Sequence, residues 1–276
     1  MRRATLLIVL FVGLLGLLGL VVSCGSDRDD GSTSDGSTTS ASGGGGASEL
    51  SGEITVAAAA SLTEAYTKIG ADFEAANPDT KVTFTFDSSG TLSEQIGRGA
   101  PVDVFASADE ANMTKLVDQD LVDGEPTRFA RNELAIVAEP GNPEGIEALA
   151  DVADVGIVSL CGEDVPCGKS AKRVLSEAGV EIPESSVTRG QNVKATLTAV
   201  TEGDAVAGIV YVTDAQTAAD QVETITIPRD ENAIAVYPVG VLRKAGNAEV
   251  AQAFADYVAS DDGQVVLQSF GFLPPS

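Results

Sequence analysis

The chain has 276 residues, which is enough for one large domain or two smaller ones. Its formal net charge is −24, and so acidic a surface disfavours binding to nucleic acids and to anionic lipids. It contains no histidine, which excludes Ser-His-Asp triads, Cys-His dyads and metal sites with histidine ligands.

The N-terminal segment predicts export and attachment to a lipid. Arg2 and Arg3 precede an apolar run over residues 6–22, and Cys24 follows that run after one small residue. This order is typical of a secretory signal. It resembles the signal of bacterial lipoproteins, in which the cysteine is acylated and becomes the first mature residue. We therefore expect residues 1–23 to be a signal peptide and the protein to be anchored through Cys24 to the outer face of the cytoplasmic membrane.

Two alternatives for this segment remain open. The apolar run is nearly long enough to cross a bilayer as a plain transmembrane anchor, and the paired arginines also fit a twin-arginine export signal. A cysteine directly after the apolar run favours the lipoprotein interpretation. The next segment, residues 24–51, is rich in Ser, Thr, Gly and Asp and cannot bury a core, so we expect a flexible tether.

From Gly52 onward, short strands alternate with helices. The pattern predicts strands at 53–60, 82–86, 102–107, 133–140, 155–160, 187–189, 207–215, 223–228 and 233–242. It predicts helices at 62–76, 91–98, 109–119, 146–152, 170–179, 192–201, 248–260 and 263–270. Ser61 and Glu64 have the spacing of a capping box for the first of these helices. The alternation indicates an α/β fold built on parallel strands.

The stretch CGEDVPCGKS, residues 161–170, ends like a phosphate-binding P-loop. The first glycine of that motif would have to stand at position 163, where the chain has a glutamate. A misplaced glycine and an acidic side chain in the loop both disfavour a nucleotide site. The helix-like run that follows retains one useful property, because helix N-termini attract anions.

The same stretch contains two cysteines six positions apart, Cys161 and Cys167. An exported protein lives in oxidising surroundings, so we expect these two residues to form a disulfide. A metal site is disfavoured because structural zinc requires four ligands, and a redox pair is more often C-x-x-C.

A strand, a polar turn and a helix follow one another at three places, around Ser61, Ser89 and Gly168. In open α/β sheets, ligands bind beyond the carboxyl ends of the parallel strands. These turns offer N–H groups and hydroxyls but very few cations. The pattern therefore predicts a site for a small anion held by dipoles and hydrogen bonds.

Six stretches of the chain, taken in order, resemble the molybdate-binding proteins that serve ABC transporters. They are AAASLTEAY (58–66), FDSSGTLSEQIGRGAPVDVFASAD (86–109), DVPCGKSAKRVL (164–175), QNVKATLTAV (191–200), GIVYVTDA (208–215) and YPVGVL (237–242). The resemblance covers nearly all of residues 52–275. Each stretch alone is a weak signal, but six in the same order are specific.

The resemblance implies a two-lobed periplasmic-binding-protein-like fold of type II. Each lobe would be a mostly parallel sheet with flanking helices, and the ligand would lie in the cleft between the lobes. The chain would cross between lobes near 131–137 and 234–239. Lobe 1 would then comprise 52–133 and 238–276, and lobe 2 would comprise 134–237.

The resemblance also implies five contacts to an oxyanion. Carried over residue by residue, they are the hydroxyls of Ser61 and Ser89, the backbone N–H groups of Cys167 and Val193, and the hydroxyl of Tyr211. Without the resemblance, these residues would be taken as cap, turn and core residues. No protein atom would coordinate molybdenum directly, since the metal would be bound only as its oxyanion.

The function implied is capture of molybdate, and of tungstate with it, for delivery to an ABC permease and its ATPase. We expect no cofactor, no enzymatic activity and a monomer. A sulfate- or phosphate-binding protein of the same fold is the main alternative. A secreted hydrolase is disfavoured because no paired carboxylates flank Ser61 or Ser89. A surface lipoprotein that senses or adheres is a third class.

Protonated phosphate would favour a carboxylate acceptor in the site. Asp87 and Asp164 lie close in sequence to the implied contacts. We expect both to face solvent, which would favour a fully ionised oxyanion such as molybdate, tungstate or sulfate.

Overall fold

The computed structural model describes residues 50–276, all of which belong to one compact unit. The signal peptide, the lipidation site Cys24 and nearly all of the tether predicted above lie outside the described residues. Within 50–276, no helix combines the length and apolar character that a membrane span requires.

The first sheet contains five strands in the order β2-β1-β3-β10-β4. Their bounds are β1 (Gly52–Ala59), β2 (Thr80–Asp87), β3 (Val104–Ala106), β4 (Val122–Asn132) and β10 (Ala235–Leu242). β1 pairs in parallel with both β2 and β3, and β10 pairs antiparallel with both β3 and β4. Four strands therefore share one direction and only β10 is reversed.

The second sheet repeats this pattern in the order β7-β6-β8-β5-β9. Its strands are β5 (Leu134–Ala138), β6 (Val158–Cys161), β7 (Val187–Gly190), β8 (Ala207–Tyr211) and β9 (Glu223–Thr226). β6 is parallel to β7 and β8, and β5 runs antiparallel to β8 and β9. We call the first sheet with its helices lobe 1 and the second sheet with its helices lobe 2.

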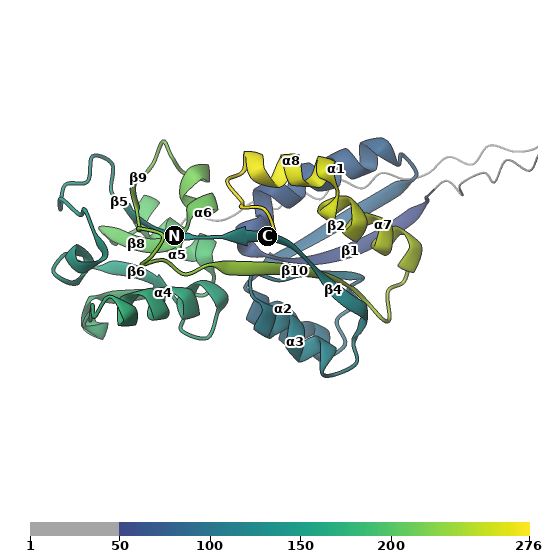
Figure 1. The fold of residues 1–276 in the computed structure, drawn as a ribbon, viewed down its shortest axis with the longest axis horizontal. Helices are drawn as coiled ribbons and strands as arrows, with labels where there is room; N and C mark the ends of the chain where they lie inside the picture. The colour runs from purple at the N-terminus through teal and green to yellow at the C-terminus, as the bar shows by residue number, and fades with distance from the viewer. Residues whose placement is uncertain (1–49) are drawn as a thin grey trace, which may run out of the picture. The chain divides into compact units, whose positions relative to one another are not determined.

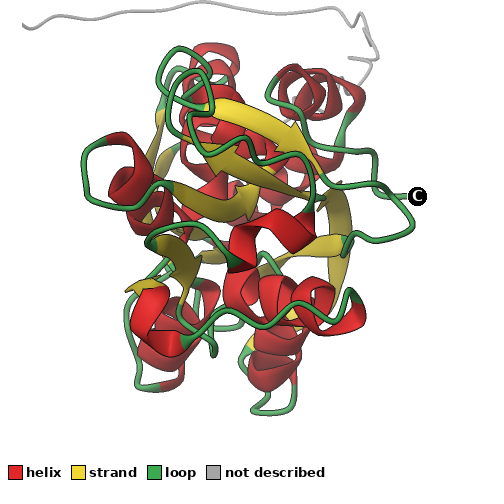
Figure 2. Ribbon diagram, turned by 90° about the vertical axis from the view of Figure 1, so that its left-hand side faces the viewer, coloured by secondary structure: helices red, strands yellow, loops and turns green. Residues whose placement is uncertain are grey.

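Helices cover both sheets (Figures 1 and 2). In lobe 1, helices α1, α7 and α8 contact one another on one side of the sheet, and α2 and α3 form a pair on the other side (Figure 1). In lobe 2, α4 packs on β6 and β8, while α5 and α6 contact each other. The bounds are α1 (Thr63–Ala76), α2 (Ser89–Gly97), α3 (Glu110–Val117), α4 (Pro166–Glu177), α5 (Val193–Thr201), α6 (Val212–Thr217), α7 (Ala248–Ala259) and α8 (Asp261–Ser269). Three short 3₁₀ helices complete the structure: η1 (Ala60–Leu62), η2 (Leu149–Ala153) and η3 (Glu184–Ser186).

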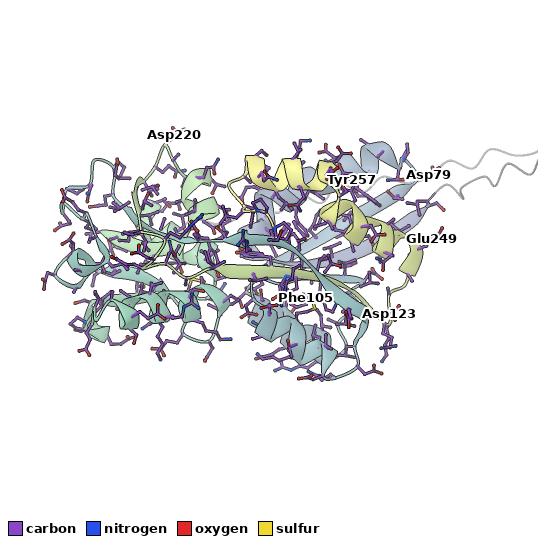
Figure 3. All side chains as sticks on the ribbon, viewed as in Figure 1. Asp79, Phe105, Asp123, Asp220, Glu249 and Tyr257 are labelled. Carbon is purple, nitrogen blue, oxygen red and sulfur yellow. A yellow bond between two sulfur atoms is a disulfide. The ribbon has the colours of Figure 1, made fainter. Side chains whose placement is uncertain are left out.

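Aromatic side chains fill the core of lobe 1. Tyr66 and Phe254 are fully buried, and their ring centroids lie 6.0 Å apart at a steep angle, an arrangement that aromatic pairs favour. On the other side of the sheet, Phe105 from β3 packs in the cluster that α2 and α3 cover (Figure 3). Acidic side chains such as Asp79 and Asp220 lie exposed at the surface (Figure 3). The negative charge is thus spread over the outside of a well-packed fold.

The chain passes from lobe 1 to lobe 2 and back. Only Glu133 separates β4 from β5, and residues 227–234 lead from β9 back to β10. Near the first crossing, Arg131 and Leu273 exchange two backbone hydrogen bonds of 2.9 Å, which tie the C-terminal segment to β4. The two crossings are the chain connections between the lobes.

The sequence pattern missed the longest strand, β4. Its sequence, VDGEPTRFARN, contains Gly124 and Pro126 among polar residues, which favours a loop. The structure places this strand at the edge of the sheet, where one side needs no partner strand and proline is tolerated.

Three helix starts also differ from the expectation. Helix α4 begins at Pro166 and not at residue 170, because proline suits the first turn of a helix. Helix α2 begins at Ser89, with the Ser88 side chain accepting a hydrogen bond from the Thr91 N–H. Ser61 does not cap α1 but lies in the preceding 3₁₀ helix, so the predicted capping box is wrong.

Candidate ligand-binding site

Six strands end at one pocket. Three of them, β1, β2 and β3, belong to lobe 1, and β6, β7 and β8 belong to lobe 2. The pocket is lined by the residues at or just after the carboxyl ends of these strands. The lining includes all five residues named from the sequence: Ser61, Ser89, Cys167, Val193 and Tyr211. The pocket therefore brings together residues as far apart in the sequence as Ser61 and Tyr211, which are separated by 150 positions.

The pocket is small and uncharged. Its volume is about 10 Å³, which is room for about one water-sized group. No Asp, Glu, Lys or Arg among residues 50–276 lines it. In this arrangement any ligand larger than water, a tetrahedral oxyanion included, requires the pocket to widen.

A larger hollow in lobe 2 has a different character. It measures about 320 Å³ and lies beside α4 and β7. Lys172 and Arg189 at its border pair with Glu163, so their charges are already satisfied within the protein. This hollow is lined by lobe 2 alone, whereas the smaller pocket lies at strand ends of both lobes, which favours the smaller pocket as the candidate site.

Ser61 and Ser89 are almost fully and fully buried, respectively. The Ala108 N–H donates a hydrogen bond of 2.9 Å to Ser89 Oγ, so the hydroxyl hydrogen of Ser89 is free to donate. Ser61 Oγ lies 2.9 Å from the hydroxyl oxygen of Tyr237 on β10. Each serine thus has one partner inside the protein and can offer its remaining capacity to the pocket.

Two helices direct their first N–H groups at the pocket. Cys167 is the second residue of α4, and Val193 is the first residue of α5. The first N–H groups of a helix have no partner within the helix, and the helix dipole gives that end a partial positive charge. The two helix ends therefore favour an anion in the pocket, where no lysine or arginine of the described residues lies.

The predicted disulfide between Cys161 and Cys167 is confirmed. It joins the end of β6 to the first turn of α4, and it holds the backbone of Cys167 against lobe 2. Gly168 packs so closely here that an added Cβ would lie 1.9 Å from the carbonyl oxygen of Gly162. The loop therefore has little freedom around the Cys167 N–H.

Tyr211 is the last residue of β8 and is 1% exposed. Its hydroxyl has no hydrogen-bond partner among the described residues. Burial raises the pKa of Tyr211 well above its ordinary value, so the hydroxyl keeps its hydrogen. A buried hydroxyl without a partner costs about 1–3 kcal/mol, and an anion in the pocket would supply the missing acceptor.

Three polar contacts join the lobes around the pocket. Lys194, next to Val193, lies 2.8 Å from Glu64 of α1. The Asn192 side chain donates to Asp87 at 3.1 Å, and Lys169 lies 3.7 Å from Asp109. These contacts form only when the lobes are close together.

Lys194 also lies 3.1 Å from Asp214, which is fully buried in lobe 2. Burial raises the pKa of Asp214 to about 6, although Lys194 opposes the shift. Burial lowers the pKa of Lys194, but Asp214 and Glu64 outweigh it and the pKa is raised. Lys194 therefore remains charged and binds carboxylates of both lobes.

The two aspartates near the site do not supply an acceptor to the pocket. Asp164 is exposed, as expected. Asp87 is half-buried rather than free in solvent, since it accepts hydrogen bonds from the Ser88 N–H and the Asn192 side chain. Neither residue lines the pocket.

Sequence reasoning missed Tyr237 and Lys194. Tyr237 contacts Ser61 across 176 positions, and Lys194 contacts Glu64 across 130 positions. No local sequence pattern predicts contacts between residues so far apart in the chain. The motifs YPVGVL and QNVKATLTAV, which contain Tyr237 and Lys194, were the only sequence signals at these positions.

Comparison with known proteins supports the fold and the resemblance drawn from the motifs. The family described as bacterial extracellular solute-binding proteins matches residues 54–273. The molybdate-binding protein ModA of Mycobacterium tuberculosis (strain ATCC 25618 / H37Rv) is 37% identical over 260 residues, covering 94% of this chain and 95% of the relative.

Two solved structures share the fold. The periplasmic molybdate-binding protein of Azotobacter vinelandii aligns with a TM-score of 0.74 at 19% identity, over 81% of this chain and 100% of that chain. The sulfate-binding protein SubI from Mycobacterium tuberculosis H37Rv aligns with a TM-score of 0.72 at 20% identity, over 80% and 86%. The two-lobed fold expected from the sequence is confirmed.

Replacing Gly168 by alanine is expected to lower the free energy of unfolding by about 1–3 kcal/mol, because backbone must move to admit the methyl group. Gly156→Ala is the matched control, since its Cβ would make ordinary contacts of 3.5 Å with Val206. Chemical denaturation of both variants measures the difference. Equal stability of the two would contradict the close packing of the loop.

Replacing Asp214 by asparagine should change how stability depends on pH. The folded protein holds this proton more tightly than the unfolded chain, so the stability from protonation is present below pH 3.8 and is lost as the pH rises to about 6. Over this range the wild type should lose stability relative to Asp214→Asn. Thermal unfolding measures it, with the exposed Asp220→Asn as control. Parallel curves for wild type and Asp214→Asn would show that the pKa is not raised.

Proposed function

The chain belongs to the bacterial extracellular solute-binding proteins, and from this premise we propose that it captures molybdate, and tungstate with it, outside the cytoplasmic membrane. It delivers the anion to the permease of an ABC importer. The relative from Mycobacterium tuberculosis, 37% identical over almost the whole chain, is named a molybdate-binding protein, which supports this substrate.

One observation carries the proposal: the pocket combines five potential donors with no charged side chain among the described residues. The donors are two serine hydroxyls, one tyrosine hydroxyl and two N–H groups at helix starts. A small, fully ionised tetrahedral anion has four oxygens that only accept hydrogen bonds. Its chemistry therefore matches the pocket better than that of a cation or a neutral solute.

Binding replaces the hydration shell of the anion with these donors. Hydrogen bonds to a charged group contribute about 1.5–3 kcal/mol each, more than bonds between neutral groups. Because the donors come from both lobes, the anion draws the lobes together. The motion is a hinge closure at the two chain crossings.

Within the described part of the chain, no lysine or arginine lines the pocket, which favours release as well as capture. A direct ion pair in a buried site would have to be broken before the anion could leave. Neutral donors are instead lost as the lobes separate and water returns. A binding protein that must hand over its ligand benefits from this arrangement.

The surrounding organisation follows from the same proposal. Residues 1–23 direct export, Cys24 carries the lipid, and 24–51 tether the folded part to the membrane. The lobes divide near residues 133 and 237, and a monomer docks on the permease, which an ATPase drives. We expect the protein to bind its ligand without converting it, since no carboxylate among residues 50–276 lines the pocket to act as a general base.

Sulfate is the second candidate, because the sulfate-binding protein SubI has a closely similar fold. Sulfate is also a fully ionised tetrahedral dianion, so it would accept from the same donors. It is smaller than molybdate, and size is then the only property that separates the two. The 37% identical relative named for molybdate favours the larger anion.

Calorimetric titration of the soluble chain from residue 51 onward tests the proposal. Molybdate and tungstate should bind tightly, sulfate weakly, and phosphate more weakly still. Ser61→Ala and Ser89→Ala should each weaken molybdate binding by roughly 10- to 100-fold, the value of one hydrogen bond to a charged group. Ser159→Ala, a buried serine of β6 outside the pocket, is the control and should bind normally. Binding of sulfate alone would keep the fold and reject the substrate.

Removing one contact between the lobes should weaken molybdate binding although the substituted residue does not line the pocket. Glu64→Gln leaves the Lys194–Asp214 pair intact and removes only the partner in lobe 1. Because the pair is partly exposed, we expect affinity to fall by about three- to fivefold, through faster dissociation. Stopped-flow kinetics measure both rates. Glu94→Gln, whose ion pair with Arg98 lies within α2, is the control. An unchanged dissociation rate would show that the contact does not stabilise the closed state.

A further inference from the structure

Tyr237 lies behind Ser61 and does not itself line the pocket. It belongs to β10, close to the chain crossing, and is 0% exposed. Its hydroxyl oxygen is 2.9 Å from Ser61 Oγ, and geometry alone allows either hydroxyl to donate. The direction of this one hydrogen bond decides whether Ser61 can accept from a ligand.

Asn132, the last residue of β4, fixes that direction. Its side-chain oxygen accepts a hydrogen bond of 3.0 Å from the Glu133 N–H. The amide nitrogen therefore faces the other way, 2.8 Å from the Thr213 hydroxyl and 3.4 Å from the Tyr237 hydroxyl oxygen. An amide nitrogen only donates, so Tyr237 receives a hydrogen from Asn132.

Asn132 already donates to Tyr237, and among the described residues Ser61 Oγ is the acceptor within hydrogen-bond distance of the Tyr237 hydroxyl. Because a buried hydroxyl hydrogen without an acceptor is costly, the hydrogen of Tyr237 is directed to Ser61. Burial raises the pKa of Tyr237 far above its ordinary value, so the hydroxyl always carries that hydrogen. Ser61 Oγ then accepts from Tyr237, which leaves its own hydrogen free to donate into the pocket. The Ala108 N–H orients the Ser89 hydroxyl in the same way. Both serines are thus oriented as donors before any ligand arrives.

We propose that Tyr237, oriented by Asn132, is a positioning residue that orients Ser61 as a donor and thereby disfavours protonated oxyanions in the pocket. The inference rests on the proposed function. A fully ionised dianion only accepts hydrogen bonds and satisfies every donor. Hydrogen phosphate carries an O–H group that needs an acceptor, and no carboxylate among residues 50–276 lines the pocket to provide one.

The test is a titration of Tyr237→Phe with molybdate and with phosphate. The variant frees Ser61 to accept, so molybdate affinity should fall about tenfold, as for the loss of one oriented hydrogen bond. Phosphate affinity should stay the same or rise, because phosphate can now donate to Ser61. The ratio of the two affinities should therefore fall by at least about tenfold. A change that merely loosened the fold would lower both affinities together.

Two tyrosine variants serve as controls. Tyr66→Phe removes the hydroxyl of a buried tyrosine in the core of lobe 1, which has no hydrogen-bond partner among the described residues and lies outside the pocket. It should leave both affinities unchanged. Tyr211→Phe removes a donor that faces the ligand directly, so it should weaken both anions by a similar factor. Only Tyr237→Phe should change the ratio.

The outcomes separate the two proposals. If the wild type binds no dianion, the proposed function fails and the inference with it. If the wild type prefers molybdate and Tyr237→Phe keeps the same ratio, the function stands and the inference is overturned.

A measurement on the wild type alone provides a second test. Phosphate is titrated in two buffers of different ionisation enthalpy, which reports the protons exchanged on binding. Either no binding or binding with release of a proton supports an all-donor pocket. Binding of phosphate with its proton retained would overturn the inference.

Discussion

A small anion that enters this pocket gives up its hydration shell, and the protein has to replace that shell with a lining to which residues 50–276 contribute no lysine or arginine. The rest of the site depends on this constraint. In a chain of net charge −24, local attraction has to come from oriented dipoles, so helices α4 and α5 direct free N–H groups at the pocket. Hydroxyls supply the other donors, and each serine is held by a partner behind it. The disulfide at the start of α4 keeps one of the N–H groups in place.

The two sheets explain how the donors meet. In each sheet, three neighbouring strands are parallel, and their carboxyl ends face the pocket. The next strand of each sheet runs in the opposite direction. Each lobe therefore contributes equivalent ends, and neither lobe holds a complete site. The reversed strands β10 and β5 lie next to the crossings, so the hinge and the site are built from the same part of the chain. The ion pair between Lys194 and Glu64 adds a small stabilisation of the closed arrangement at the rim of the pocket. Capture and closure are thus one process.

Much of the fold and part of the site could be predicted from local patterns. Ser61 and Ser89 stand at strand-to-helix turns, which sequence reveals because small polar residues interrupt apolar periodicity. Val193 and Tyr211 look like core residues, and only the family resemblance pointed to them. Tyr237 could not be found, because its role depends on a contact across 176 positions and on the orientation of an amide. The edge strand β4 escaped detection because glycine, proline and polar residues at a sheet edge resemble a loop.

A crystal structure of the soluble chain with molybdate, with anomalous scattering recorded at the molybdenum edge, tests the central claim most directly. The account predicts a single molybdenum position in the pocket. The oxygens should lie about 2.7–3.1 Å from the hydroxyls of Ser61, Ser89 and Tyr211 and from the N–H groups at the starts of α4 and α5. Molybdenum bound elsewhere, or an oxygen of the anion in direct contact with a lysine, arginine or carboxylate, would contradict capture by neutral donors.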